Sequence, residues 1–253
     1  MNSLKEKYGN WALITGASSG IGKEFAIQLA QQNINLVLVA RRDDKLKELA
    51  SELEQKNGIE TIVLPLDLSK PNFIKDIEQV TYNIEIGLVI NNAGFTITKE
   101  FIDSEIQYQQ ELINVNITAL TVLTHYFGNK MKQNRKGGII NVASGSGYLP
   151  IPNWATYAAS KAYVLHFTEA LWYELKPFNV DVLALCPGVT KTEFNNSSNM
   201  QKGMTVAEVV STALHNLSKR PSVIVGIKNK FSIGMLKLFG RKTLIKIGAK
   251  IVE

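Results

Sequence analysis

The sequence predicts a doubly wound α/β domain, built on a parallel sheet of about seven strands with helices on both faces. Short apolar runs rich in branched residues recur along the chain, and such runs are typical of strands buried on both faces. Longer segments with helical periodicity separate these runs, an alternation typical of parallel sheets. No change in composition divides the 253 residues, so residues 1–253 are expected to form one domain.

The predicted elements follow one another with turn residues at most of their junctions. The predicted strands are residues 12–14, 36–40, 62–66, 87–90, 138–142, 180–185 and 222–225. The clearest helical segments are residues 23–32, 43–56, 105–131 and 157–175. Asp43 or Asp44 is a suitable N-cap for the second of these helices.

Composition narrows the class of protein. Apolar residues make up 45% of the chain, which is enough for a sizeable core. Cys186 is the only cysteine, so an intrachain disulfide is excluded and a reducing compartment is favoured. The chain has neither an apolar run of ~18 residues nor an apolar signal core at its start, so a cytoplasmic location is expected. Its three histidines lack metal-ligand spacing, so no metal site is expected.

The net charge of +6 is unevenly distributed. Seven basic residues and no acidic residue lie between Lys228 and Val252, a segment that is also partly apolar. Because the excess charge is concentrated in this tail, nucleic-acid binding is not expected.

A glycine-rich turn joins the first predicted strand to the first predicted helix. Glycines allow the backbone to turn tightly and to approach a diphosphate closely, and a helix N-terminus attracts the anion. The spacing is G-x-x-x-G-x-G, which differs from the more familiar G-x-G-x-x-G. The prediction of a phosphate-binding turn therefore depends on the strand before it and the helix after it. The predicted phosphate-binding residues are Gly16, Ser18, Ser19, Gly20, Ile21 and Gly22.

Two arginines at the end of the second predicted strand bear on the choice of cofactor. NAD sites place an acidic residue near this point to bind the ribose 2′-hydroxyl, whereas arginine suits the 2′-phosphate of NADP. Ala40 stands where the acid is expected, and Arg41 and Arg42 follow it. We therefore predict NADP(H). Asp43 and Asp44 argue the other way, but they are better placed to start the next helix.

The motif Tyr157-x-x-x-Lys161 lies in the last long helical segment. Residues four apart share one face of a helix. An ammonium group beside a phenol lowers the phenol pKa from ~10, which suits a general acid or base. Alone, this motif is common by chance.

Several motifs in order along the chain resemble those of the short-chain dehydrogenase/reductase family. The tail also resembles a branch that includes 3-ketoacyl and 17β-hydroxysteroid reductases. The resemblance covers nearly the whole chain and implies a Rossmann-like fold and hydride transfer between a nicotinamide and a carbonyl or alcohol carbon. The matching pieces are Thr15 to Gly22, Asp67, Asn91 to Gly94, Asn116, Ser144, Tyr157 with Lys161, and Pro187 to Thr192.

The resemblance implies a role for each catalytic residue. Tyr157 exchanges the proton with the substrate oxygen, and Ser144 hydrogen-bonds the same oxygen. Lys161 binds the nicotinamide ribose and tunes Tyr157, while Asn116 positions a water. Ser144 is preferred to Ser146 because it precedes Tyr157 by thirteen residues, and Asn116 is preferred to Asn114 by its distance from Gly94. Further implied cofactor contacts are Asp67, Leu68, Asn92, Ala93, Gly94, Pro187, Gly188, Val189 and Thr192.

The segments after the fourth, fifth and sixth strands carry many apolar residues, which indicate a small-molecule carbonyl or alcohol substrate of apolar character. Residues 193–204 are expected to form a lid. These apolar residues are Phe95, Ile97, Tyr148, Leu149, Ile151, Trp154, Val189, Phe194, Met200 and Met204.

The basic extension 228–253 has two interpretations. In the favoured one, it forms terminal helices that cover the pocket or a subunit contact. In the other, it makes weak contact with an anionic membrane surface or an acyl-carrier group. The resemblance also implies a homodimer or homotetramer. A non-catalytic NADP-binding regulatory or scaffold protein is the alternative function, disfavoured because all four catalytic residues are present.

Overall fold

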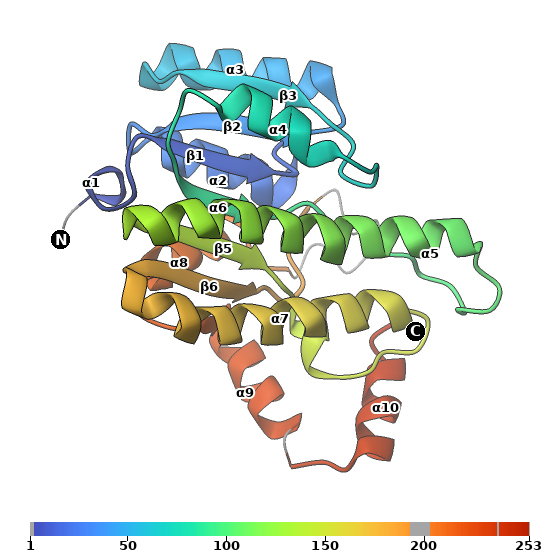
Figure 1. Cartoon of the computed structure of the whole chain (residues 1–253). Coiled ribbons are helices and arrows are strands. Elements are labelled where there is room, and N and C mark those ends of the chain that lie inside the picture. The colour runs from blue at the N-terminus through green and yellow to red at the C-terminus, as the bar shows by residue number, and fades with distance from the viewer. Residues whose placement is uncertain (1–2, 193–202, 237, 253) are drawn as a thin grey trace.

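The computed structural model describes residues 3–192, 203–236 and 238–252 (Figure 1). Its centre is one seven-stranded sheet in the order β3-β2-β1-β4-β5-β6-β7, and all neighbouring strands are parallel. The predicted doubly wound α/β architecture is therefore confirmed. The strands are β1 (Trp11–Thr15), β2 (Asn35–Ala40), β3 (Thr61–Pro65), β4 (Ile86–Asn91), β5 (Gly137–Val142), β6 (Val180–Cys186) and β7 (Ser222–Ile224).

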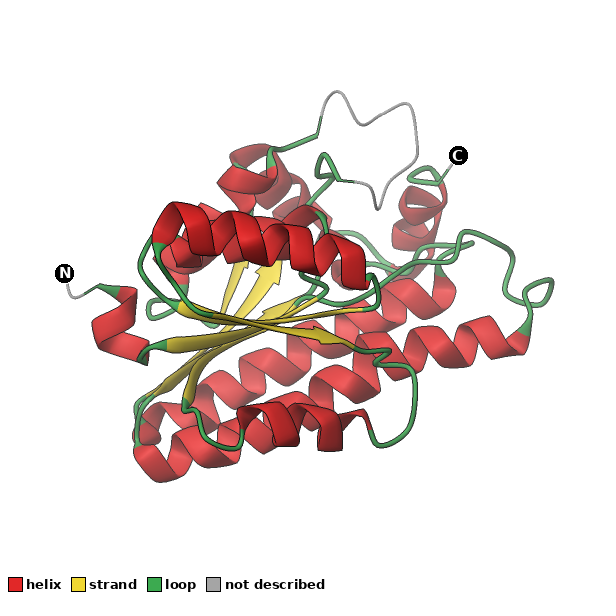
Figure 2. Cartoon of the chain, turned by 90° about the horizontal axis from the view of Figure 1, so that it is seen from above, coloured by secondary structure: helices red, strands yellow, loops and turns green. Residues whose placement is uncertain are grey.

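Helices cover both faces of the sheet, and Figure 2 shows the strands between two helical layers. Successive strand residues point to opposite faces, so Ala12 and Ile14 pack in one core while Leu13 packs in the other. This is why the strands are apolar throughout. The first core includes α2 (Gly20–Ala30), α3 (Asp43–Asn57) and α8 (Val206–Asn216), and the second includes α4 (Phe73–Thr81), α6 (Leu120–Asn134) and part of α7 (Ala155–Leu175).

The structure differs from the sequence predictions at three points. The segment 105–131 is not one regular helix, because a π-helical turn at Asn114–Ala119 separates α5 (Ile106–Ile113) from α6. The N-cap of α3 is Arg42, and Asp43 and Asp44 occupy the first turn, where the helix dipole stabilises negative charge. Helices α1 (Leu4–Tyr8), α4 and α8 were not predicted.

The basic tail forms α9 (Ile227–Leu236) and α10 (Arg241–Ala249), which extend from the body of the molecule and are joined at their far ends (Figure 1). Helix α10 returns to the segment after β5. A Cβ on Gly248 would lie 2.1 Å from the Pro150 carbonyl oxygen, so only glycine permits this close approach. A small cluster that includes Leu149 and Ile151 packs against Leu236 and Ile247 of the tail.

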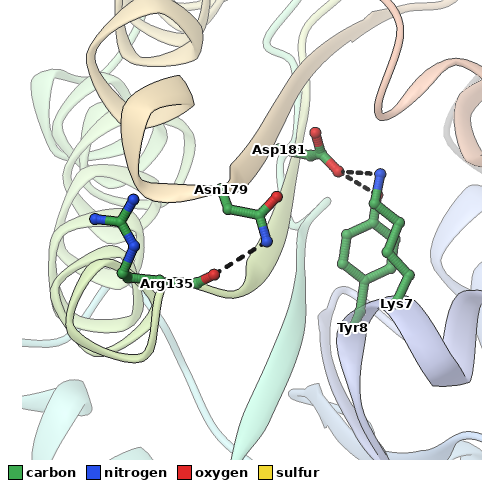
Figure 3. Close-up of polar contacts among 5 residues, drawn as sticks. All are labelled: Lys7, Tyr8, Arg135, Asn179 and Asp181. Carbon is green, nitrogen blue, oxygen red and sulfur yellow. Dashed lines mark hydrogen bonds and ion pairs between the residues drawn. The ribbon is translucent and has the colours of Figure 1, made fainter.

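The opposite end of the sheet is closed by the amino-terminal helix and by turns (Figure 3). The Tyr8 hydroxyl donates to Asp181 Oδ2 at 2.8 Å, and Lys7 Nζ lies 2.6 Å from the same oxygen. Burial, followed by the charge of Asp181, raises the pKa of Tyr8. Nearby, Asn179 Nδ2 donates to the Arg135 carbonyl at 3.0 Å and ties together the turns that precede β6 and β5. These contacts lie at the amino ends of the strands, away from the cavity described next.

Candidate active site

A cavity of about 720 Å³ lies at the carboxyl ends of the parallel strands, the usual position of a ligand site in such sheets. Loops after the first six strands, together with α9 and α10, form its walls. Of the predicted catalytic and cofactor-binding residues, only Gly22 and Asn116 do not line it. Those that do are Gly16, Ser18, Ser19, Gly20, Ile21, Arg41, Arg42, Asp67, Leu68, Asn92, Ala93, Gly94, Ser144, Tyr157, Lys161, Pro187, Gly188, Val189 and Thr192.

The turn after β1 has the shape that a diphosphate requires. Gly16 and Gly20 have φ values of +66° and +55°, a region that favours glycine. A Cβ on Gly22 would lie 2.2 Å from the Gly16 carbonyl oxygen, so Gly22 acts through packing of the turn, behind the cavity wall. The first N–H groups of α2 lack partners within their own helix and the helix dipole is positive there, so the turn fits an anion.

The Thr15 side chain, to which the sequence analysis gave no role, joins this turn to the loop after β4. Its hydroxyl oxygen accepts from the backbone N–H groups of Asn92 and Ala93 at 2.9 and 3.0 Å. Asn92 Nδ2 in turn donates to the carbonyls of Thr15 and Gly16. No motif signalled these contacts, because they join residues about 77 positions apart.

A positively charged corner lies at the ends of β2 and β3. The Arg42 guanidinium donates to the Ser18 and Ser19 hydroxyls, with distances of 3.0 and 2.7 Å from Nη2. Partial burial acts to raise the pKa of Asp67, but hydrogen bonds from Ser69 and the charge of Arg41 hold it below its usual value. Arg41 and Arg42 thus lie beside the glycine turn, where an anionic group of a dinucleotide would bind.

Tyr157 and Lys161 lie side by side on α7, and both are buried. Lys161 Nζ is 5.8 Å from the centroid of the Tyr157 ring and donates to the Val142 carbonyl at 2.8 Å. Burial lowers the pKa of Lys161 to about 8. Burial raises the pKa of Tyr157, and the neighbouring hydroxyls of Ser144 and Ser146 only partly oppose this effect. The lowered phenol pKa expected from Lys161 is therefore not found, because burial raises the pKa of Tyr157.

Two serine hydroxyls near Tyr157 differ in their hydrogen bonding. Ser144 Oγ accepts from the backbone N–H of Ser146 at 3.1 Å and begins the short 3₁₀ turn Gly145–Tyr148. Ser146 Oγ is buried and has no hydrogen-bond partner among the described residues. Because an unpaired buried hydroxyl is costly, this orphaned group beside the phenol fits a polar atom of a ligand.

Asn116 lies in the π-helical turn and is fully buried. Its side chain accepts from the Phe95 N–H at 3.1 Å and donates to the Phe95 carbonyl at 3.0 Å and to Ser160 Oγ at 3.2 Å. It therefore clamps the loop after β4 to α7. A Cβ on Gly94 would lie 3.1 Å from Asn116 Oδ1, so glycine allows this clamp to close.

The rest of the cavity wall is mainly apolar. Phe95, Leu149, Ile151, Trp154 and Val189 line it as expected, whereas Ile97, Tyr148 and Met204 do not. The Tyr148 hydroxyl instead reaches Cys186 Sγ at 3.8 Å. Phe194, Met200 and most of the predicted lid lie outside the described residues. The sequence analysis also did not assign to the pocket several lining residues from the last strand and the tail, namely Ile224, Asn229, Ser232, Ile233, Leu236, Ile247 and Ile251.

The tail therefore covers the pocket, as the favoured interpretation of the sequence predicted. Of the helices in the described part of the chain, none has the length and apolar character needed to span a bilayer. Residues 3–192, 203–236 and 238–252 contain no cluster of His, Cys, Asp or Glu side chains suited to a metal ion.

Comparisons with known proteins agree on one family. The family model described as short chain dehydrogenase matches residues 10–203. A 7β-hydroxysteroid dehydrogenase from Mediterraneibacter gnavus is 35% identical over 241 residues, which are 91% of each chain. A solved 7β-hydroxysteroid dehydrogenase structure superposes with a TM-score of 0.92 at 30% identity and covers 98% of this chain and 99% of its own.

A short-chain dehydrogenase from Sphingobium yanoikuyae, solved in complex with NADPH, has a TM-score of 0.80 and 30% identity. That superposition covers 91% of this chain and 96% of the other. The chain belongs to the short-chain dehydrogenase family, and it is an oxidoreductase that acts on alcohol and carbonyl groups.

Proposed function

We propose that this short-chain dehydrogenase uses NADP(H) to interconvert a bulky apolar ketone and the matching secondary alcohol, with Tyr157 as the acid/base. The observation that carries the proposal is the position of the buried Tyr157. Its hydroxyl lies near two serine hydroxyls and shares one cavity with the glycine turn and with an apolar wall.

The described residues fit NADP(H). The glycine turn and the start of α2 suit the diphosphate, and Arg41 and Arg42 suit the ribose 2′-phosphate. The remaining predicted contacts, from Asp67 and Leu68 through Asn92, Ala93 and Gly94 to the segment from Pro187 to Thr192, extend along the same cavity. When bound, the nicotinamide supplies or accepts the hydride. NADPH in the related Sphingobium structure supports this choice of cofactor.

The protein's own contribution is to orient the substrate and to move one proton. Tyr157 donates its hydroxyl proton to the substrate oxygen in reduction, or accepts a proton from the alcohol in oxidation. Because its pKa is raised, Tyr157 is protonated at neutral pH and is ready for reduction. The Ser144 hydroxyl holds the same oxygen, and the unpaired Ser146 Oγ is a second candidate for this contact.

Lys161 and Asn116 support the tyrosine. With a pKa of about 8, Lys161 is mainly a cation at neutral pH, so it stabilises the phenolate that forms as the proton leaves. Asn116 keeps the loop after β4 against α7 through Phe95 and Ser160. The water-positioning role of Asn116 remains part of this proposal.

The apolar wall supports a bulky, weakly polar substrate. Leu149, Ile151 and Trp154 face the cavity from the segment after β5, and Ile233 and Leu236 face it from α9. Two relatives, at 30% and 35% identity, are 7β-hydroxysteroid dehydrogenases. A rigid polycyclic alcohol or ketone of the steroid type is therefore the substrate class that we propose.

We also propose that the enzyme is a homodimer or homotetramer. Exposed apolar side chains on and beside the long helices support this, with Ile106 and Ile113 on α5 and Tyr163 and Tyr173 on α7. Such unpartnered surface suits a subunit contact. A cytoplasmic location stays a prediction from the sequence.

The test replaces Tyr157 by phenylalanine, which keeps the ring and removes the proton. We expect Tyr157→Phe to bind NADPH as the wild type does. The fluorescence of the bound cofactor measures this binding. Its NADPH-dependent reduction of steroid ketones should fall at least 100-fold. The control Tyr163→Phe changes an exposed tyrosine of the same helix and should stay active. Comparable activity of Tyr157→Phe and wild type would refute the proposed acid/base.

Ser144→Ala and Ser146→Ala, assayed in parallel, decide which hydroxyl holds the substrate oxygen. The variant that lacks the essential contact should lose at least tenfold in kcat, with unchanged affinity for NADPH. A wild-type protein that binds NADPH but reduces no ketone of a broad panel would support the non-catalytic alternative instead.

A further inference from the structure

Helix α9 has two apolar faces on opposite sides. The inner face carries Ile233 and Leu236, which line the cavity. The outer face carries Ile227 and Phe231, which are 84% and 69% exposed. A surface helix of a globular protein ordinarily has one apolar face, directed at the core, and a polar face directed at water. The outer face of α9 does not follow this pattern, because it exposes large apolar side chains to water.

The exposed side chains form one continuous stripe. Ile227, Phe231 and Met235 follow one another at four-residue intervals, which places them on one side of the helix. In the turn after the helix, the N–H of Leu238 donates to the Met235 carbonyl, which keeps Leu238 close to the end of the row. Leu238 is 82% exposed. We call these four residues the outer stripe.

Two basic side chains, Lys228 and Lys230, are exposed on α9 beside the outer stripe. The second helix of the tail, α10, exposes Arg241, Lys242 and Lys246. From residue 227 to residue 252 the sequence contains no acidic residue. An exposed apolar stripe on a segment with basic and no acidic residues is the pattern of a helix that lies in the interface of an anionic membrane.

The arrangement of the tail makes this surface accessible. Helices α9 and α10 extend away from the sheet and its covering helices (Figure 1). A flat surface can therefore approach the outer stripe and the basic residues around it. The opposite face of α9 remains against the cavity, so such contact leaves the pocket wall in place.

We propose that the outer stripe and its flanking basic residues form a docking surface for anionic lipid. Charge complementarity favours lipid over a second copy of this chain. A two-fold contact through this surface would bring two basic patches together, with no acidic residue between residues 227 and 252 to compensate for the repulsion. A lipid headgroup surface supplies negative charge, and the acyl region accepts the apolar side chains.

The test measures co-sedimentation of the full chain with extruded vesicles of phosphatidylglycerol and phosphatidylcholine in equal amounts. Vesicles of phosphatidylcholine alone serve as the uncharged comparison. We expect binding to the anionic vesicles that weakens at high salt, and at least tenfold weaker partition to the uncharged ones. The double variant Phe231→Ser/Leu238→Ser should lower partition to the anionic vesicles at least tenfold. Lys228→Glu/Lys230→Glu should do the same.

Matched controls alter comparable residues elsewhere on the surface. Tyr82→Ser/Ile102→Ser removes two side chains that are 84% and 88% exposed, and Lys75→Glu reverses an exposed charge on α4. Both controls should bind vesicles as the wild type does. Tyr157→Phe should also bind normally, which separates a failure of this inference from a failure of the proposed reaction.

Three outcomes would overturn the proposal. The first is a wild type that does not sediment with anionic vesicles at low salt. The second is equal loss of binding in the stripe variant and in Tyr82→Ser/Ile102→Ser. The third is a stripe variant that elutes as a smaller oligomer in gel filtration while vesicle binding is unchanged, because the stripe is then a contact between copies.

Discussion

Replacing the buried Lys161 by methionine is expected to stabilise the folded protein while it abolishes catalysis. Lys161 is 5% exposed, and its Nζ donates a hydrogen bond to the Val142 carbonyl. Methionine has a similar length and no charge, so Lys161→Met removes the cost of holding an ammonium away from water. The gain is expected at neutral pH, where the wild-type side chain is charged.

The size of the effect follows from the pKa of Lys161, which burial lowers from 10.5 to about 8. A lowered pKa means that the unfolded chain binds more protons than the folded one above pH 8, so wild-type stability rises with pH there. The penalty for the ammonium is ~3 kcal/mol at pH 7 and falls to ~1 kcal/mol at pH 10. Loss of the hydrogen bond to Val142 offsets roughly 1 kcal/mol of the stability gained by removing the ammonium. Lys161→Met should therefore be about 2 kcal/mol more stable at pH 7, with almost no advantage at pH 10.

The assay is urea unfolding followed by tryptophan fluorescence at pH 7, 8, 9 and 10, for wild type and variant. The difference in the free energy of unfolding between the two proteins is the quantity of interest, because other titrating groups cancel. The control Lys75→Met alters an exposed lysine and should retain the pH dependence of the wild type. An advantage of Lys161→Met that stays constant from pH 7 to pH 10 would refute the reasoning, as would a less stable variant at pH 7.

Three further substitutions test the cofactor site and the base of the sheet. Gly22→Ala places a Cβ 2.2 Å from the Gly16 carbonyl oxygen, so NADPH affinity should fall at least tenfold in a fluorescence titration; unchanged affinity would contradict the proposed turn. Arg42→Ala should weaken NADPH binding roughly 10- to 100-fold and NADH binding little, and an equal loss for both would exclude 2′-phosphate recognition. Tyr8→Phe removes the hydrogen bond to Asp181 and should lower the free energy of unfolding by about 1.5–3 kcal/mol, measured by urea, with kcat unchanged.

Much of the fold could be predicted from local patterns. Each strand of the sheet begins and ends within one residue of the bounds of a predicted apolar run. The agreement is close because a parallel strand covered on both faces needs apolar residues throughout. The short helices α1 and α4 were missed because few residues carry their periodicity. The π-helical turn at Asn114–Ala119 was missed for another reason: its sequence continues the helical pattern, and the interruption coincides with contacts to Phe95 and Ser160.

By itself, the sequence determined the parallel α/β sheet and the glycine turn, because each depends on neighbours within a few positions along the chain. The order of motifs along the whole chain predicted most residues that line the cavity, Tyr157 and Lys161 among them. The tertiary structure alone decided the raised pKa of Tyr157, the clamp made by Asn116 and the double-faced α9. These properties depend on burial and on contacts between segments far apart in the chain, and such contacts leave no periodic signal in a single sequence.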